Sequence, residues 1–197
     1  MKLPDIDLAK LREHDKSGAA YHEAGHLVVA IHFRITCWCH IKDERPGTLE
    51  EVAFSGQARF GCGEHTLVPF RAAAIGWAGV LASAILRGMD TEEAIQDVWE
   101  IYESLEWEIS PTDLASINRH PMRWRTCTTA ARILAHNLPL LHHIAGELLK
   151  HGLYPHEQTP DKEYARCNGN KWNPKSHKPC PEFPVIPRPR RLPRPVA

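Results

Sequence analysis

The segment Ala20-Tyr21-His22-Glu23-Ala24-Gly25-His26-Leu27-Val28-Val29-Ala30 decides what the rest of the chain is expected to do. Its centre has the pattern H-E-x-x-H, and two histidines at this spacing lie about one turn apart on the same face of a helix. Their imidazoles can therefore converge on one metal ion. Glu23 follows the first histidine and is placed to take a proton from a metal-bound water, which is the division of labour in zinc hydrolases.

The residues around the pattern favour a functional interpretation over a coincidental one. A five-residue pattern can match by chance, and His and Glu at this spacing are usually solvated residues on a helix surface. Here the pattern lies inside the strongly apolar segment 19–33, where unpaired His and Glu are costly to bury. We expect Ser17 or Asp15 to cap this helix and Gly25 to mark a close approach by another backbone.

Length, composition and charge predict a soluble protein with one main domain. A chain of 197 residues can bury a substantial core. Its 24 basic residues balance 24 acidic ones, so no global charge favours nucleic acid or a membrane surface. No uninterrupted apolar run reaches the roughly 18 residues of a spanning helix, and residues 1–7 have no signal-peptide character. We therefore expect a cytoplasmic protein without a membrane span.

Three regions are expected along the chain. Residues 1–16 are polar and mixed in charge and predict an N-terminal arm or a short lead-in helix. Residues 17–155 hold the metal-binding pattern and the apolar periodic segments, so they predict a zinc metallopeptidase-like domain. Residues 156–197 are rich in proline and end in a basic stretch. Such a composition buries too little apolar surface to fold, so this tail is expected to be disordered.

The fold class is expected to be mainly α, of the α+β type, with a small antiparallel sheet beside the metal-binding helix. Residues 35–41 are rich in β-forming residues and predict a strand. Residues 52–54 predict the start of a second strand, and residues 56–61 a third strand or an edge. An edge strand beside the metal helix would let an extended peptide bind through backbone hydrogen bonds.

Small and apolar residues fill the segment 69–86, which predicts a buried helix. Gly76, Gly79 and Ala82 would let neighbouring elements approach this helix closely. The other helix signals are a capping box at Asp90 and Glu93, a start at Ser110-Pro111, and an apolar periodic segment over 128–151 that Pro139 interrupts.

A catalytic zinc ion usually has three protein ligands and one open position, so a third ligand is needed. His32 completes the spacing H-E-x-x-H-x-x-G-x-x-H, but Val29 stands where that pattern has the glycine that turns the chain. A helix that continues through Val29 directs His32 away from His26, so His32 is expected not to bind the metal. Acidic alternatives lie downstream at Asp97, Glu100, Glu103, Glu106, Glu108 and Asp113.

Asp113 differs from the other acidic candidates because it begins a helix, where one carboxylate can be held rigidly and pointed inward. However, Ser110 lies three residues before it, and in such a capping box Asp113 would only bond backbone amides. Spacing alone does not choose between Asp113, Glu103 and Glu106.

Over residues 15–155 the chain resembles the peptidase domain of the FtsH-type ATP-dependent zinc proteases. The segments that carry the resemblance occur in the family's order: 20–26 at the metal-helix signature, 76–82 at the small-residue helix, 112–114 at the segment with the third zinc ligand, and 131–153 at the closing helices. The resemblance implies a zincin-like helical metallopeptidase domain in which His22, His26 and Asp113 bind zinc (Zn2+) and Glu23 is the catalytic base.

The expected activity is that of a zinc-dependent, ATP-independent metalloendopeptidase. No G-x-x-x-x-G-K-[ST] phosphate loop occurs in the chain, so no ATP binding is expected. Substrates would then be flexible peptides or unfolded polypeptides, and a homo-oligomer or a separate unfoldase partner is left open. Two alternatives are a regulatory protease that cuts one cognate protein and a catalytically silent, zinc-containing adaptor.

The six cysteines show no regular disulfide framework. A second, structural zinc site could combine Cys37, Cys39, His40, Cys62 and His65, although separate buried thiols and surface imidazoles are the favoured interpretation. Cys167, His177 and Cys180 could clip the C-terminal segment, where a solvated tail is favoured instead.

Overall fold

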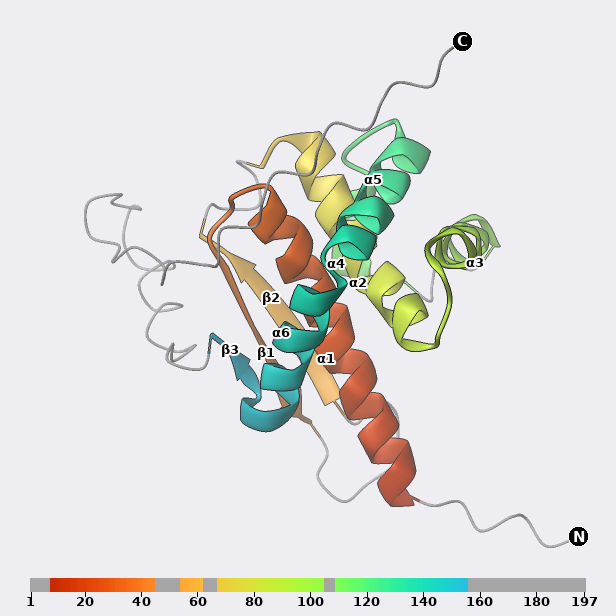
Figure 1. Ribbon diagram of the computed structural model, residues 1–197. Coiled ribbons are helices and arrows are strands. Elements are labelled where there is room, and N and C mark those ends of the chain that lie inside the picture. The colour runs from red at the N-terminus through yellow and green to blue at the C-terminus, as the bar shows by residue number, and fades with distance from the viewer. Residues whose placement is uncertain (1–7, 45–53, 62–66, 105–108, 156–197) are drawn as a thin grey trace, which may run out of the picture. The chain divides into compact units, whose positions relative to one another are not determined.

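The fold is built around one long helix, α1 (Leu8–His32), which carries the H-E-x-x-H pattern. The computed structural model describes residues 8–44, 54–61, 67–104 and 109–155. Within them the other elements are β1 (Cys37–Asp43), β2 (Phe54–Phe60), α2 (Pro69–Leu86), α3 (Thr91–Ser104), α4 (Pro111–Ile117), α5 (Arg123–His136), α6 (Leu138–His151) and β3 (Leu153–Tyr154). The predicted class, mainly α with a small antiparallel sheet, is confirmed (Figure 1).

Helix α2 has the predicted bounds and is buried along most of its length, against α1, α4 and α5. It approaches α1 closely at Gly25, as the sequence predicted. A Cβ atom at Gly25 would contact the carbonyl oxygen of Ala78 and would lie 2.7 Å from Cβ of Ala82. The absence of a side chain at Gly25 therefore lets the two helices that form the core come into backbone contact.

Helix α2 also has the length and composition of a helix that could cross a membrane, the one such helix among the described residues. Most of it is buried inside the protein, as the core helix of a soluble domain would be. This is weak evidence in either direction, so the cytoplasmic location remains a prediction.

The sheet has the order β2-β1-β3, with both pairs antiparallel. The expected strand over 35–41 is found two residues later, as β1. The expected break between the second and third strands is wrong, because Gly56 continues β2 opposite Ile41. The side chain of Glu23 packs so closely against Gly56 that a Cβ atom there would collide with it, so this position of the strand requires glycine. Residues 52 and 53 lie outside the described part, and β3 was not predicted.

The expected helix start at Ser17 or Asp15 is wrong, because α1 already begins at Leu8. Tertiary contacts hold the additional turns. The Phe54 amide donates a hydrogen bond of 2.9 Å to the Asp15 carboxylate, and Arg12 pairs with Asp43 at 2.5 Å. Asp15 therefore joins α1 to β2 instead of capping a helix, and residues 8–16 are not a separate arm.

The other predicted helix boundaries are largely confirmed. Asp90 accepts hydrogen bonds from the amides of Glu92 and Glu93, and its own amide donates to the Glu93 carboxylate, as in a capping box. The long segment begins at Arg123, five residues before the predicted start at 128, and is divided into α5 and α6 at Asn137, with Pro139 in the first turn of α6. The C-terminal tail, 156–197, lies outside the described residues.

Candidate metal centre

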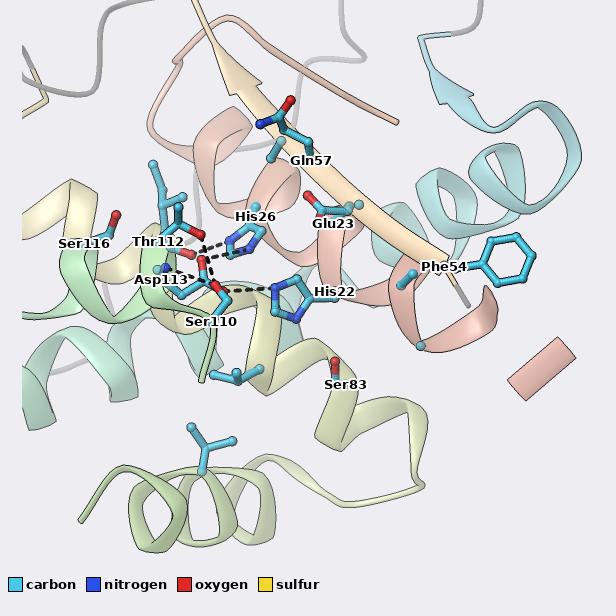
Figure 2. A pocket seen from close by; sticks show the side chains of 18 of the residues that line it. His22, Glu23, His26, Phe54, Gln57, Ser83, Ser110, Thr112, Asp113 and Ser116 are labelled. Carbon is cyan, nitrogen blue, oxygen red and sulfur yellow. Dashed lines mark hydrogen bonds and ion pairs between the residues drawn. The ribbon is translucent and has the colours of Figure 1, made fainter. Parts of the chain in front are cut away.

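Three side chains from distant parts of the chain meet at one point (Figure 2). Nε2 of His22 lies 3.0 Å from Oδ2 of Asp113, although 91 residues separate the two along the chain. Nε2 of His26 lies 3.3 Å from Oδ1 of the same carboxylate. All three donor atoms lie within 4.8 Å of one another, and no other such group of three His, Cys, Asp or Glu occurs in the described part of the chain.

A hydrogen bond to the backbone determines which ring nitrogen of His26 faces His22 and Asp113. Its Nδ1–H donates to the carbonyl oxygen of Ile75 at 2.7 Å. A neutral His26 therefore presents the lone pair of Nε2 to the Asp113 carboxylate, and two such acceptors repel each other unless a cation lies between them. The outward hydrogen bond of a metal-binding histidine typically has this role of fixing the tautomer.

The donor set fits zinc. Imidazole nitrogen and carboxylate oxygen are ordinary zinc ligands, with bond lengths of about 2.0–2.2 Å. In a tetrahedral site such bonds place two ligand atoms about 3.3–3.6 Å apart, close to the 3.0 and 3.3 Å that separate the two histidines from Asp113. These distances run to different oxygens of the carboxylate, and the three donor atoms all lie within 4.8 Å of one another, so His22, His26 and Asp113 could hold one zinc ion once they draw together around it.

The alternative in which the Asp113 carboxylate only bonds backbone amides is wrong, because this carboxylate faces the two histidines. The backbone amide of Asp113 donates to the Ser110 hydroxyl at 3.1 Å, so Ser110 caps α4, while the carboxylate turns to the two histidines. Burial would raise the pKa of Asp113, but the interactions with His26 and His22 outweigh burial and lower it to about 2. The carboxylate is therefore held in its charged form.

The other acidic candidates do not reach this point. Glu100 and Glu103 lie exposed on α3, and Asp97 pairs with Arg87 at 2.5 Å. Glu106 and Glu108 lie outside the described residues. Helix α1 continues through Val29, as expected, and His32 lies at its end, where burial and then the neighbouring His136 lower its pKa. His32 is not part of the cluster of donor atoms.

Glycines in α2 bring this helix against the candidate ligands. A Cβ atom at Gly79 would lie 2.5 Å from Nε2 of His22 and 2.6 Å from Nε2 of His26. A Cβ atom at Gly76 would lie 2.9 Å from the Asp113 carbonyl oxygen. The sequence predicted close packing at these glycines, and the structure shows that the candidate ligands are what they pack against.

Replacing Gly79 with alanine is expected to weaken zinc binding about 10- to 100-fold, the range found when a group that orients a ligand is altered. The added methyl group would push both imidazoles out of line. Competition with a chromophoric chelator would measure the affinity. The matched control is Gly18→Ala, also in a helix, since a Cβ atom there meets nothing within 4 Å. Equal zinc affinities in the two variants would contradict the close approach at Gly79.

Glu23 lies beside the ligands and is only 5% exposed. Its carboxylate accepts a hydrogen bond from the Ala58 amide, and its Oε2 atom is buried with no hydrogen-bond partner. Burial raises the pKa of Glu23 to about 7; His26 opposes this shift, Asp113 adds to it, and the Ala58 amide opposes it. One carboxylate oxygen of Glu23 is therefore available to hold a proton next to the candidate metal.

The centre opens into a cleft of about 630 Å³, within the usual range of about 300–1,000 Å³ for ligand pockets. Strand β2 forms one side. Two of its backbone amides point away from β1, because Phe54 donates to Asp15 and Ala58 donates to Glu23. This edge of β2 has no neighbouring strand; it lies along α1, and its Phe54 and Ala58 amides are bonded to α1 side chains where it borders the cleft beside Glu23.

The structure describes only some of the cysteines in these predictions. Cys37 and Cys39 are buried thiols on β1 that form no disulfide, as the favoured interpretation expected. Burial, followed by the charge of Glu23, raises the pKa of Cys39 well above its ordinary value. Cys62 and His65, like Cys167 and Cys180, lie outside the described residues.

Two backbone groups at the site were missed by the sequence interpretation. They are the carbonyl of Ile75 and the amide of Ala58. Both contribute only backbone atoms, which leave no mark in a side-chain pattern. No protein-family model and no curated protein matches the chain, so its function is inferred from the site.

Proposed function

We propose that this protein is a zinc-dependent, ATP-independent metalloendopeptidase with a zincin-like fold, which hydrolyses peptide bonds in flexible or unfolded polypeptides. The observation that carries the proposal is the convergence of His22, His26 and Asp113 beside Glu23, whose Oε2 atom is buried without a partner. The resemblance to FtsH-type peptidases assigns the same roles to the same residues.

The roles of the side chains follow from their positions. His22, His26 and Asp113 would hold the metal, and Ile75 would keep His26 in the required tautomer. Zinc supplies Lewis acidity toward the scissile carbonyl and a more acidic water. The carboxylate of Glu23 would accept the proton that the attacking water loses and would pass it to the nitrogen of the leaving amine.

Strand β2 supports the choice of an extended polypeptide as substrate. Its edge without a neighbouring strand borders the cleft next to Glu23; the Phe54 and Ala58 amides there are bonded to α1 side chains, and the backbone of a peptide would pair with the other backbone groups of this edge. A folded protein cannot present its chain in this form, whereas an unfolded or flexible segment can. No ATP-dependent step is required for such substrates.

The two alternatives differ from this proposal in observable ways. A regulatory protease would make one dominant cut in one cognate protein and leave unfolded chains intact. A catalytically silent adaptor would bind zinc without needing the buried carboxylate of Glu23. The presence of Glu23 beside the candidate ligands favours an enzyme.

Metal removal tests the proposal directly. We expect the zinc-loaded protein to degrade unfolded casein without ATP, to lose this activity in a strong chelator, and to regain it when zinc is restored. Far-ultraviolet circular dichroism of the stripped protein would separate loss of the metal from loss of the fold. The proposal fails if the zinc-loaded protein cuts neither casein nor short peptides, or if the stripped and folded protein cuts them equally fast.

A further inference from the structure

Acidic and basic residues are segregated between two neighbouring helices, although the whole chain has no net charge. Helix α3 carries five Asp or Glu residues and no Lys or Arg. Helix α5 carries three arginines and no acidic residue. The two helices pack against each other, and α3 lies on the side of the fold remote from the sheet (Figure 1). The surface over these helices therefore presents two adjoining areas of opposite charge.

The acidic area lies on the face of α3 that is turned away from the cleft. Glu103 is exposed and follows Trp99 by one helical turn, and the exposed Glu92 precedes Trp99 by two turns, so all three share one face. Val98 and Ile101 line the cleft, and the helical repeat places them on the opposite face. A partner that covers the acidic area therefore leaves the cleft open.

Trp124 marks the border between the two charged areas. Its ring packs edge-on against that of Trp99 on α3, with the ring centroids 5.0 Å apart. Despite this contact, 45% of Trp124 is exposed. Arg125 follows it on α5 and is also exposed. The border thus combines a large aromatic surface with a positive area on one side and a negative area on the other.

Two further apolar side chains extend this surface. Met122 is 49% exposed, and Val68, just before α2, is 55% exposed. The segment with Val68 lies beside the segment with Met122, because the Arg119 guanidinium donates to the Leu67 carbonyl at 3.3 Å. With the tryptophan, these are three of the four large apolar side chains that are exposed in the described part of the chain. Such a cluster marks an interaction site, and Trp, Met and Arg are enriched in protein interfaces.

We propose that this surface binds a second copy of the protein in a two-fold symmetric dimer. It is called the α3–α5 surface here and comprises Glu92, Glu103, Arg125, Trp124, Met122 and Val68. A two-fold axis along the border between the charged areas places the acidic area of each copy against the basic area of the other. The two Trp124 side chains then meet near the axis and lose their remaining exposure to water. A net charge of zero adds no general repulsion between the copies.

The charges favour a second copy over an anionic partner. The basic area by itself would suit an anionic polymer such as a nucleic acid. The acidic residues of the adjoining helix would repel that polymer, whereas they attract the basic area of a second copy. The inference is independent of the proposed peptidase function, because no residue of the α3–α5 surface belongs to the candidate metal centre or lines the cleft.

Sedimentation equilibrium of the full chain over a range of concentrations tests the dimer. We expect a dimer at about 0.1 M salt and a dissociation constant at least about tenfold higher at about 1 M salt, because the Debye length falls from about 10 Å to about 3 Å. Trp124→Ala is expected to raise the dissociation constant at least about 30-fold, as the loss of a central aromatic residue does at protein interfaces. Leu11→Ala is the matched control, because Leu11 is 46% exposed and lies on α1.

A pair of charge reversals tests which areas meet. Arg125→Glu and Glu103→Arg each place like charges on both sides of the axis, so each variant alone is expected to dimerise at least about tenfold more weakly than the wild type. In an equal mixture, the two altered areas face each other with opposite charges and the other side of the axis is unchanged. A dimer with one copy of each variant is therefore expected to form with nearly the wild-type affinity. Circular dichroism would show that both exposed substitutions leave the fold intact.

The proposal is overturned if the wild type stays monomeric at every concentration in low salt, or if Trp124→Ala dimerises as tightly as the wild type. It is also overturned if the mixture of the two charge variants stays monomeric. A monomeric wild type that binds single-stranded DNA, and loses this binding in Arg125→Glu, would assign the basic area to an anionic partner instead. Casein hydrolysis tests the proposed function separately, so either proposal can fail without the other.

Discussion

Replacing Glu23 with glutamine is expected to lower the rate of casein hydrolysis at least about a hundredfold and to leave the bound zinc unchanged. The size follows from the loss of a general base, which contributes about 10²- to 10⁴-fold. Glutamine retains the length and shape of the side chain, so its contacts with Gly56 and the Ala58 amide can persist. It cannot accept a proton, and the three candidate zinc ligands are untouched.

The matched control for this variant is Glu13→Gln, the same change at an exposed position of α1. It makes the same chemical change on the same helix, so it separates the role of Glu23 from a general effect of replacing a glutamate of α1. Metal content measured by mass spectrometry should be equal in both variants and in the wild type. Wild-type hydrolysis by Glu23→Gln would show that Glu23 is not the base.

Replacing Asp113 with asparagine is expected to weaken zinc binding by at least about a hundredfold. Altering a group that merely orients a ligand costs about 10- to 100-fold, and here the charged ligand itself is lost. The Asp113 amide would still donate to Ser110, so the cap of α4 is kept and the helix can still form. The expected result is therefore a folded protein that keeps its two histidines but has little affinity for zinc.

Asp97→Asn is the control for the loss of one carboxylate, because Asp97 pairs with Arg87 and is outside the metal cluster. Its zinc affinity, measured by chelator competition, should equal that of the wild type. If Asp113→Asn also binds zinc with the wild-type affinity, Asp113 only begins α4 and the third ligand has been misassigned.

Local chemistry made several features predictable from the sequence. The apolar run of α2 and its glycines predicted both its bounds and its close packing, because Arg71 and Ser83 are the only polar residues in the helix and do not form an exposed face along it. Asp90 and Glu93 predicted the start of α3 for a similarly local reason, since a capping box is completed within four residues. The pairing of His22 with His26 also depends only on the rise and turn of one helix.

The errors occurred where distant contacts override local signals. Asp15 has the chemistry of a cap but binds the Phe54 amide, and α1 therefore extends to Leu8. A glycine at position 56 indicated a break between strands, but β2 continues through it. The residue is glycine because the side chain of Glu23 fills the space that a larger residue would need. Neither partner could be identified from the neighbouring sequence.

The sequence by itself determined that His22 and His26 share one face of a helix and that Glu23 lies between them, because the α-helical repeat sets that arrangement within five residues. Only the tertiary structure decided that Asp113 completes the group, since its carboxylate becomes a neighbour of His22 through the packing of α4 and α2 against α1. The spacing of side chains along the sequence cannot show that two residues 91 positions apart are neighbours. They become neighbours because Gly76 and Gly79 let α2 pack closely against Asp113 and the two histidines.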